Sequence, residues 1–228
     1  PQAATADYTL AAYAEDVLAL LEQLNIARAW LIGHSLGGSV ALWGADLARD
    51  RIQGVICLNA GGGIYLKDEF EKFRTVGQQL VKYRAPWLAK LPGIDWVFSR
   101  DSVAQSIGRQ WGRQRAIDFV SANAEAARGT LLESTTEAEV HRLPQIVAGL
   151  PQPVYFIAGT QDTIMAPKYV HHLASFHRLY QAEDATRSNL VELPNCGHFA
   201  MLEATATVAQ LITQILQSGL TQPRLPLN

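Results

Sequence analysis

Three residues of this chain have the types and the order along the sequence that nucleophilic catalysis by a serine requires. Ser35 lies in the segment Gly-His-Ser-Leu-Gly at 33–37, and Asp162 and His198 follow it, each shortly after an apolar run. A serine hydroxyl becomes an effective nucleophile only when a histidine accepts its proton, and that histidine needs an acid to fix its tautomer. The three residues therefore predict a Ser-Asp-His triad that attacks a carbonyl, forms an acyl-enzyme and hydrolyses it.

The segment around Ser35 has the pattern G-x-S-x-G, in which a sharp turn from a strand into a helix holds the serine hydroxyl clear of the sheet. An apolar run precedes it at 29–32, and a segment of small residues that predicts a closely packed helix follows it. The turn is so tight that we expect neither Gly33 nor Gly37 to accept a side chain. Ser35 could instead be an ordinary helix N-cap, but the acid and the histidine downstream favour the nucleophile.

The acid and the histidine both follow segments that predict buried strands. Residues 153–158 form an apolar run that leads into Gly-Thr-Gln-Asp, and residues 190–193 are followed by Pro-Asn-Cys-Gly-His. Asp162 and His198 therefore lie after the carboxyl ends of strands, where open parallel sheets place their sites. Asp162 could alternatively be a turn residue or the cap of a helix that begins near 166–167.

Other residues could fill the same roles. Glu183 and Asp184 are alternative acids, but the stretch 181–188 is polar and predicts an exposed loop. Three further histidines, at positions 171, 172 and 177, follow the acid on a predicted helix, where we expect them to be solvated. We expect no metal site, because no carboxylate or cysteine recurs near them at ligand spacing. His34 is expected to line the elbow as a substrate-binding residue rather than to act as the base.

With the nucleophile, acid and base in this order, the sequence resembles the α/β-hydrolase superfamily, in particular members with a helical lid between the sixth and seventh strands. The resemblance extends over nearly the whole chain and is carried by the elbow at 32–38, the corner at 159–162 and the Cys-Gly-His loop at 196–198. A narrower similarity, carried by the lid, is to cyanobacterial and plastid hydrolases related to chlorophyll dephytylases. The resemblance implies an α/β fold, in which a mostly parallel sheet is flanked by helices.

The domain organisation follows from where the alternation of strands and helices is interrupted. Strands and helices alternate over residues 1–63 and 151–218, which form the hydrolase core. Residues 64–150 form a helical lid, and residues 219–228 form a tail. In the core we predict helices over 9–24 and 36–49 and strands over 29–33, 52–58, 153–158 and 190–193. The glycines at 61–63 lack the Lys and Ser/Thr of a phosphate-binding loop and predict a flexible exit into the lid.

The lid is the part of the chain expected to recognise the substrate. Three of the five tryptophans lie in it: Trp87, Trp96 and Trp111. They could form a small core of the lid itself, or they could roof an apolar pocket for an acyl or isoprenoid ester. Three arginines lie around the last of them: Arg109, Arg113 and Arg115. These could hold a substrate carboxylate or form a solvated helix face.

The oxyanion of the tetrahedral intermediate needs at least two backbone donors. One is the N–H of Leu36, and the resemblance implies a second donor from the loop after the third strand. Only 34 residues, with one predicted helix, precede Ser35, where members of the superfamily place four strands. The strand at 29–33 would then be an apolar edge strand. We therefore expect the sequence to be the C-terminal portion of a larger hydrolase, or to receive the missing strands from another chain. By itself, this sequence is expected to hydrolyse activated esters poorly or not at all, because half of its oxyanion hole is missing.

The composition narrows the class of protein. The 228 residues are 48% hydrophobic, enough for one sizeable core, and the net charge of −2 provides no broad basic surface for nucleic acid. No apolar run approaches the length of a membrane span. Cys57 and Cys196 fall two strands apart and predict free thiols of a cytoplasmic protein.

The leading functional interpretation is a serine hydrolase that needs no cofactor and cleaves a small-molecule carboxylic ester, most simply an apolar one. Two alternatives use the same triad and fold. One is the hydrolysis of a C–C bond in a dienoate acid, or a lyase step on such an acid. The other is a ligand receptor in which the lid acts as a switch.

Overall fold

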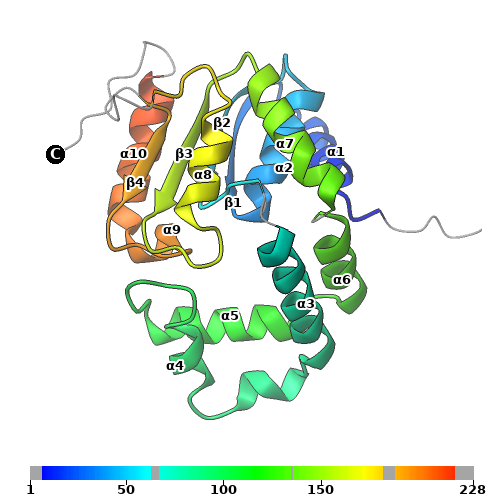
Figure 1. Cartoon of the computed structure of the whole chain (residues 1–228), viewed down its shortest axis with the longest axis vertical. Coiled ribbons are helices and arrows are strands. Elements are labelled where there is room, and N and C mark those ends of the chain that lie inside the picture. Colours follow the sequence, from blue (N-terminus) through cyan, green and yellow to red (C-terminus); the bar gives the residue numbers. More distant parts are fainter. Residues whose placement is uncertain (1–6, 63–66, 135, 182–187, 219–228) are drawn as a thin grey trace, which may run out of the picture.

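Four parallel strands, in the spatial order β1-β2-β3-β4, form the sheet that carries the site (Figure 1). The computed structural model describes residues 7–62, 67–134, 136–181 and 188–218. The strands are β1 (Ala29–His34), β2 (Ile52–Leu58), β3 (Val154–Gly159) and β4 (Leu190–Leu193). All four predicted strands are confirmed within about one residue. Pro153 lies just before β3, where its missing N–H costs nothing and its carbonyl still accepts from Val55 N.

Helices cover both faces of the sheet, and the alternation of side chains along β2 explains why both faces are apolar. Successive residues of a strand point to opposite faces. Val55 and Cys57 lie in one core cluster with side chains of α1 (Leu10–Gln23), α2 (Leu36–Leu47) and α8 (Pro167–Ala174). Ile56 and Leu58 lie in the other, with α9 (Ala200–Glu203) and α10 (Thr205–Ser218). The chain therefore forms the expected α/β fold.

In the described residues, six helices lie between β2 and β3 along the chain, and all but the last are on the side to which the carboxyl ends of the strands point (Figure 1). They are α3 (Lys67–Tyr83), the 3-10 helix η1 (Pro86–Lys90), α4 (Ile94–Phe98), α5 (Arg109–Ser121), α6 (Ala124–Glu133) and α7 (Glu137–Gly149). The last helix packs on the sheet layer, because Leu143, Ile146 and Val147 at helical spacing belong to the same core cluster as α2. We call the other five the insertion helices.

The edge of the sheet formed by β1 is open among the described strands. β1 pairs with β2 alone, and Ile32 in its centre is exposed. This is the apolar edge that the sequence predicts, a feature that favours association with other strands.

Two expectations from composition can be compared with the described residues. No helix in this part of the chain has the length and apolar character needed to cross a membrane. Cys57 and Cys196 are free and buried, and burial raises the pKa of both thiols, that of Cys196 to about 11. Neither thiol is therefore a ready nucleophile.

The predicted tail at 219–228 and the alternative acids Glu183 and Asp184 lie outside the described residues.

Candidate active site

Ser35 occupies the turn between β1 and α2 with a backbone conformation that residues other than glycine rarely adopt. Its φ is 51° and its ψ is −123°. A Cβ at Gly33 would collide with the backbone of Gly37, so the prediction for the first glycine of the motif is confirmed. The prediction for Gly37 is wrong, because a Cβ there meets nothing within 4 Å. The second tight position is Gly38, whose added Cβ would collide with that of Ala60.

This asymmetry predicts opposite outcomes for two matched substitutions. Gly33→Ala is expected to lower the free energy of unfolding by about 2 kcal/mol or more, because the turn must open to admit a methyl group. Gly37→Ala is expected to change it by no more than about 1 kcal/mol, with the sign of a gain, because alanine favours the helix and the space is empty. Urea unfolding of both variants measures this, and equal losses in the two would contradict the geometry of the turn.

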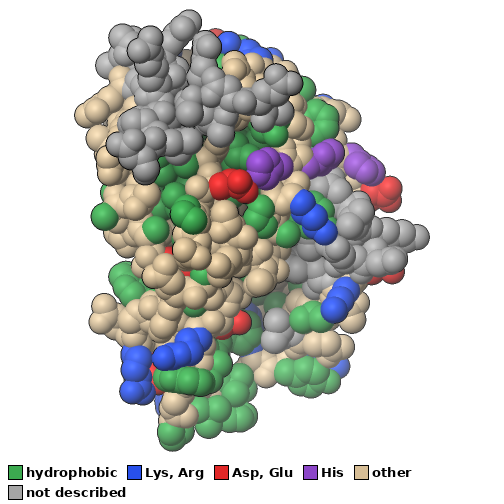
Figure 2. All heavy atoms as spheres, turned by 60° about the vertical axis from the view of Figure 1, so that its left-hand side comes forward, with side chains coloured by type: hydrophobic (Ala, Val, Ile, Leu, Met, Phe, Trp, Pro, Cys, Tyr) green, Lys and Arg blue, Asp and Glu red, His purple; other side chains and the backbone are tan. Residues whose placement is uncertain are grey.

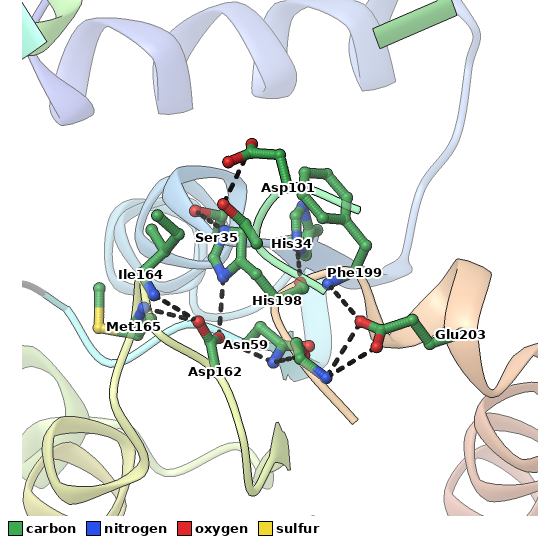
Figure 3. Close-up of polar contacts among 12 residues, drawn as sticks. His34, Ser35, Asn59, Asp101, Asp162, Ile164, Met165, His198, Phe199 and Glu203 are labelled. Carbon is green, nitrogen blue, oxygen red and sulfur yellow. Dashed lines mark hydrogen bonds and ion pairs between the residues drawn. The ribbon is translucent and has the colours of Figure 1, made fainter. Parts of the chain in front are cut away.

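The structure brings together the three residues of the predicted triad (Figure 3). His198 Nε2 lies 3.1 Å from Ser35 Oγ, and His198 Nδ1 lies 2.8 Å from Asp162 Oδ2. Asp162 follows β3 and His198 follows β4, and their exposed fractions are only 4% and 5%. The imidazole is thus placed to accept a proton from the hydroxyl while the carboxylate holds its opposite nitrogen.

Hydrogen-bond donors surround the Asp162 carboxylate. Oδ1 accepts from the backbone N–H groups of Ile164 and Met165, each at 2.8 Å, and Oδ2 accepts from Asn59 Nδ2 at 2.9 Å as well as from His198. Burial raises the pKa of Asp162, but the hydrogen bond and charge interaction with His198, together with the other donors, bring it below its ordinary value. The carboxyl group is therefore ionised at neutral pH.

The lowered pKa of Asp162 predicts how the stability of the protein depends on pH. A carboxyl group whose pKa is lower in the folded state contributes stability above its ordinary pKa of 3.8, and this contribution is lost as the pH falls through the folded value. The difference in free energy of unfolding between the wild type and Asp162→Asn should therefore shift against the wild type as the pH is lowered from about 5. Urea unfolding across this range measures it. A difference that stays constant would contradict the lowered pKa.

Asn59 is a site residue that the sequence analysis missed. It follows β2 with φ at 47°, a region that asparagine tolerates better than most residues. Its Nδ2 donates both to Asp162 and, at 3.0 Å, to the carbonyl of Gly197 beside the histidine. Its position directly after an apolar strand, like those of the triad residues, is the signal that could have found it. Residues 59–62 are buried here, and Gly61 packs against α8, so this part is not the open exit expected; Gly63 lies outside the described residues.

His34 lies beside the elbow as expected, but its ring binds the loop 194–199 that carries His198, which we call the histidine loop. Its Nε2 donates to the carbonyl of His198 at 2.7 Å, and the two rings are 4.8 Å apart. The pKa of His34 is lowered, mainly because the ring is buried. The lowered pKa keeps the imidazole neutral near pH 7.

The other histidines are not all solvated. His171 and His172 lie on α8 at the surface, and His171 contacts Glu192 at 3.0 Å. His177 is buried, which corrects the expectation: its Nε2 donates to the carbonyl of Gln152 at 3.0 Å. No group of three His, Cys, Asp or Glu side chains in the described residues is arranged to hold a metal ion.

The tryptophans of the insertion helices are not a core of those helices. Trp87, Trp96 and Trp111 are 60%, 52% and 45% exposed. Figure 2 shows hydrophobic and Lys or Arg side chains together on the surface at the end of the molecule that η1, α4 and α5 form. The alternative of a lid core is thus wrong for these three side chains, because the helices that carry them leave these positions exposed to solvent.

The three arginines near Trp111 have different surroundings. Arg113 is exposed, and Arg109 forms an exposed ion pair with Asp95 at 2.8 Å. Arg115 is half-buried, with its guanidinium 3.9 Å above the ring of Phe199. It donates to the carbonyls of Phe98, at the end of α4, and of Asp101. The expectation of a solvated helix face therefore holds for Arg109 and Arg113 but not for Arg115.

Ser35, Asp162 and His198 each follow the carboxyl end of a parallel strand, which is the arrangement typical of the α/β-hydrolase fold. Residues 2–211 match the model of the α/β hydrolase family, and the chain belongs to that family. Over 232 residues it is 26% identical to an uncharacterized protein of Mycobacterium tuberculosis; the match covers 96% of this chain and 64% of that protein. The chain thus spans less than two thirds of the length of this relative.

Other relatives have named activities. A 2-succinyl-6-hydroxy-2,4-cyclohexadiene-1-carboxylate synthase of Salmonella arizonae is 29% identical, with 87% of this chain and 72% of the relative covered. The fold is similar to that of a thermophilic esterase from Thermogutta terrifontis, with a TM-score of 0.71, 20% identity, and 96% and 75% of the two chains covered. It is also similar to 2-hydroxy-6-oxo-6-phenylhexa-2,4-dienoate hydrolase from Rhodococcus, with a TM-score of 0.68, 18% identity, and 94% and 74% covered.

Proposed function

We propose that the protein is a serine hydrolase that cleaves a carboxylic ester through Ser35, His198 and Asp162. The observation that carries the proposal is the continuous hydrogen-bond chain from Ser35 Oγ through the imidazole to the buried carboxylate. In the first half-reaction His198 Nε2 takes the hydroxyl proton as Oγ attacks the carbonyl carbon, and it then protonates the departing alcohol. In the second, water attacks the acyl-enzyme, gives its proton to His198, and releases the acid.

The oxyanion formed in each step would receive a hydrogen bond from the N–H of Leu36. Leu36 is the first residue of α2, so its N–H has no partner within the helix and lies at the positive end of the helix dipole. A donor at this position acts on the charge that develops in the transition state. The assignment supports acyl transfer by Ser35.

The surroundings of Ser35 support an apolar substrate. Leu36 and Ile164 are both exposed, and Ile164 lies close to the triad in Figure 3. The insertion helices would act as the lid, and Trp87, Trp96 and Trp111 are the candidates for its apolar contacts. The narrower similarity to chlorophyll dephytylase relatives would agree with such a substrate and stays a prediction.

Hydrolysis of a C–C bond in a dienoate acid is the second candidate. The Rhodococcus structure is named as a dienoate hydrolase, and the Salmonella relative is named as a synthase of a cyclohexadiene carboxylate. Such a substrate brings a carboxylate that a basic residue would hold. Arg109 is paired with Asp95, and Arg115 is occupied by Asp101 and backbone carbonyls. These pairings favour the ester.

A substrate panel distinguishes the two. Initial rates are measured on the protein at its natural length, with p-nitrophenyl esters of increasing acyl length and with a 2-hydroxy-6-oxo-dienoate. The Ser35→Ala variant gives the background for each substrate. We expect Ser35-dependent cleavage of the esters that increases with acyl length. Cleavage of the dienoate alone would assign the protein to the second candidate. The absence of both activities would contradict both candidate functions.

A further inference from the structure

The side chain of Glu203 binds backbone N–H groups from two separate parts of the chain. Glu203 ends α9, and its carboxylate accepts from Gly197 N at 3.0 Å and from Phe199 N at 3.3 Å, the residues on either side of His198. The same carboxylate accepts from Ala104 N at 2.7 Å and Gln105 N at 3.0 Å, in the loop 99–108 between α4 and α5. Figure 3 shows Glu203 beside Phe199 at the edge of the triad. One carboxylate therefore joins the histidine loop to the insertion helices.

A direct backbone contact strengthens the same junction. The N–H of His198 donates to the carbonyl of Ser102 in the 99–108 loop at 2.9 Å. The backbones are close enough that a Cβ at Gly197 would lie 2.7 Å from Ala104 N and from the Cα of Val103. All three consecutive amides at 197–199 are thus bound, two by Glu203 and the central one by the loop. The position of His198 depends on both.

A basic residue completes the junction from the insertion side. The Arg115 guanidinium packs on the Phe199 ring at 3.9 Å and forms an ion pair with Asp101 at 3.0 Å. Burial lowers the pKa of Arg115, and the charges of Asp101 and Glu203 oppose this. The Glu203 carboxylate thus has a favourable electrostatic interaction with this guanidinium. The arrangement gives a carboxylate, rather than a neutral acceptor, an advantage at this position.

We propose that Glu203 is a positioning residue that joins the 99–108 loop to the His198 loop, so that the insertion helices and the imidazole are held in one arrangement. The inference rests on the proposed function of His198 as the base. A carboxylate offers only acceptors, which suits four N–H donors, whereas the amide nitrogen of glutamine would face some of those donors with N–H groups of its own. A shift of the histidine by a fraction of an ångström weakens proton transfer from Ser35.

The test is the Glu203→Gln variant, compared with Glu192→Gln, which removes an exposed carboxylate on β4. Two quantities are measured: the rate of inactivation by a fluorophosphonate that labels Ser35, and hydrogen exchange of backbone amides. In Glu203→Gln we expect the maximal inactivation rate to fall on the order of 10-fold, with the half-saturating probe concentration unchanged. Exchange should become faster at Ala104, Gln105, Gly197 and Phe199, and Glu192→Gln should change neither quantity.

A second variant tests the junction without changing the carboxylate. Gln105→Pro removes the N–H donor of an exposed residue and leaves Glu203 in place, so it serves if Glu203→Gln does not fold. It also removes the hydrogen bond from Gln105 Nε2 to the carbonyl of Asn195 at 3.1 Å, so Gln105→Ala, which loses only that side-chain bond, is its control. In Gln105→Pro the inactivation rate should fall and exchange at Ala104 should rise. Faster exchange at 197–199 alone in Glu203→Gln, with 104–105 still protected, would overturn the junction. An unchanged inactivation rate would overturn the positioning role, and absence of labelling in the wild type would contradict the proposed function while the exchange data still tested the junction.

Discussion

Replacement of Ser35 by alanine is expected to abolish covalent labelling by a fluorophosphonate and to lower ester hydrolysis at least about 10³-fold, to the background rate. The reason is that Ser35 Oγ is the atom that His198 Nε2 contacts at 3.1 Å, and alanine leaves no atom to accept the acyl group. Labelling followed by mass spectrometry of the modified peptide measures the result directly. The fold should be retained, because Ser35 makes no capping hydrogen bond with its side chain.

The matched control is Ser121→Ala, which removes an exposed hydroxyl at the end of α5. It should be labelled at the wild-type rate and at the same peptide. Labelling of Ser35→Ala at the wild-type rate would exclude this serine as the nucleophile. The proposed ester hydrolase would then be wrong.

The second large effect is expected from Asp162→Asn, which should lower the rate of Ser35 acylation by about 10⁴-fold. All the close polar neighbours of this carboxylate are donors, so an amide nitrogen meets an N–H group in either orientation. If the amide nitrogen takes the place of Oδ1, it faces the N–H groups of Ile164 and Met165. If it takes the place of Oδ2, it faces Asn59 Nδ2 and His198 Nδ1. The second orientation favours the tautomer with a proton on Nε2, which cannot accept the serine proton.

The rate is measured as the second-order rate constant for fluorophosphonate inactivation at pH 7. Asp50→Asn, an exposed acid after α2, is the control and should react like the wild type. A fall of less than about 10-fold in Asp162→Asn would mean that the carboxylate does not hold the base. Circular dichroism before the assay confirms that the variant is folded.

The positions of the strands along the chain could be predicted, because buried parallel strands are continuous apolar runs. The same runs placed Ser35, Asp162 and His198 after the carboxyl ends of strands, and the geometry brings these three together. The rule extends to Asn59, which follows β2 in the same way but was not recognised as a site residue. Motif glycines were only half predictable: the clash at Gly33 arises within the turn, whereas that at Gly38 arises from Ala60, a residue of the next strand's end.

Other features could not be predicted, because they depend on which distant segments meet. His177 and the exposed His172 lie five residues apart in the segment 171–177, and only the packing of the chain against Gln152 buries His177. Trp87 and Trp111 have the apolar character of core residues, but the helices that carry them pack through other residues, such as Ala89 and Ala116. Nothing local distinguishes these cases.

By itself, the sequence determined the α/β class, the strands, and the identity and order of the nucleophile, acid and base. These follow from local periodicity and from chemistry that few residue types can perform. Only the tertiary structure decided which distant groups hold the acid and the base in place: Asn59 on Asp162, and the bond of Glu203 to the 99–108 loop. The physical reason is that hydrogen bonds across about 100 residues of sequence have no local pattern, since they exist only once the chain has folded.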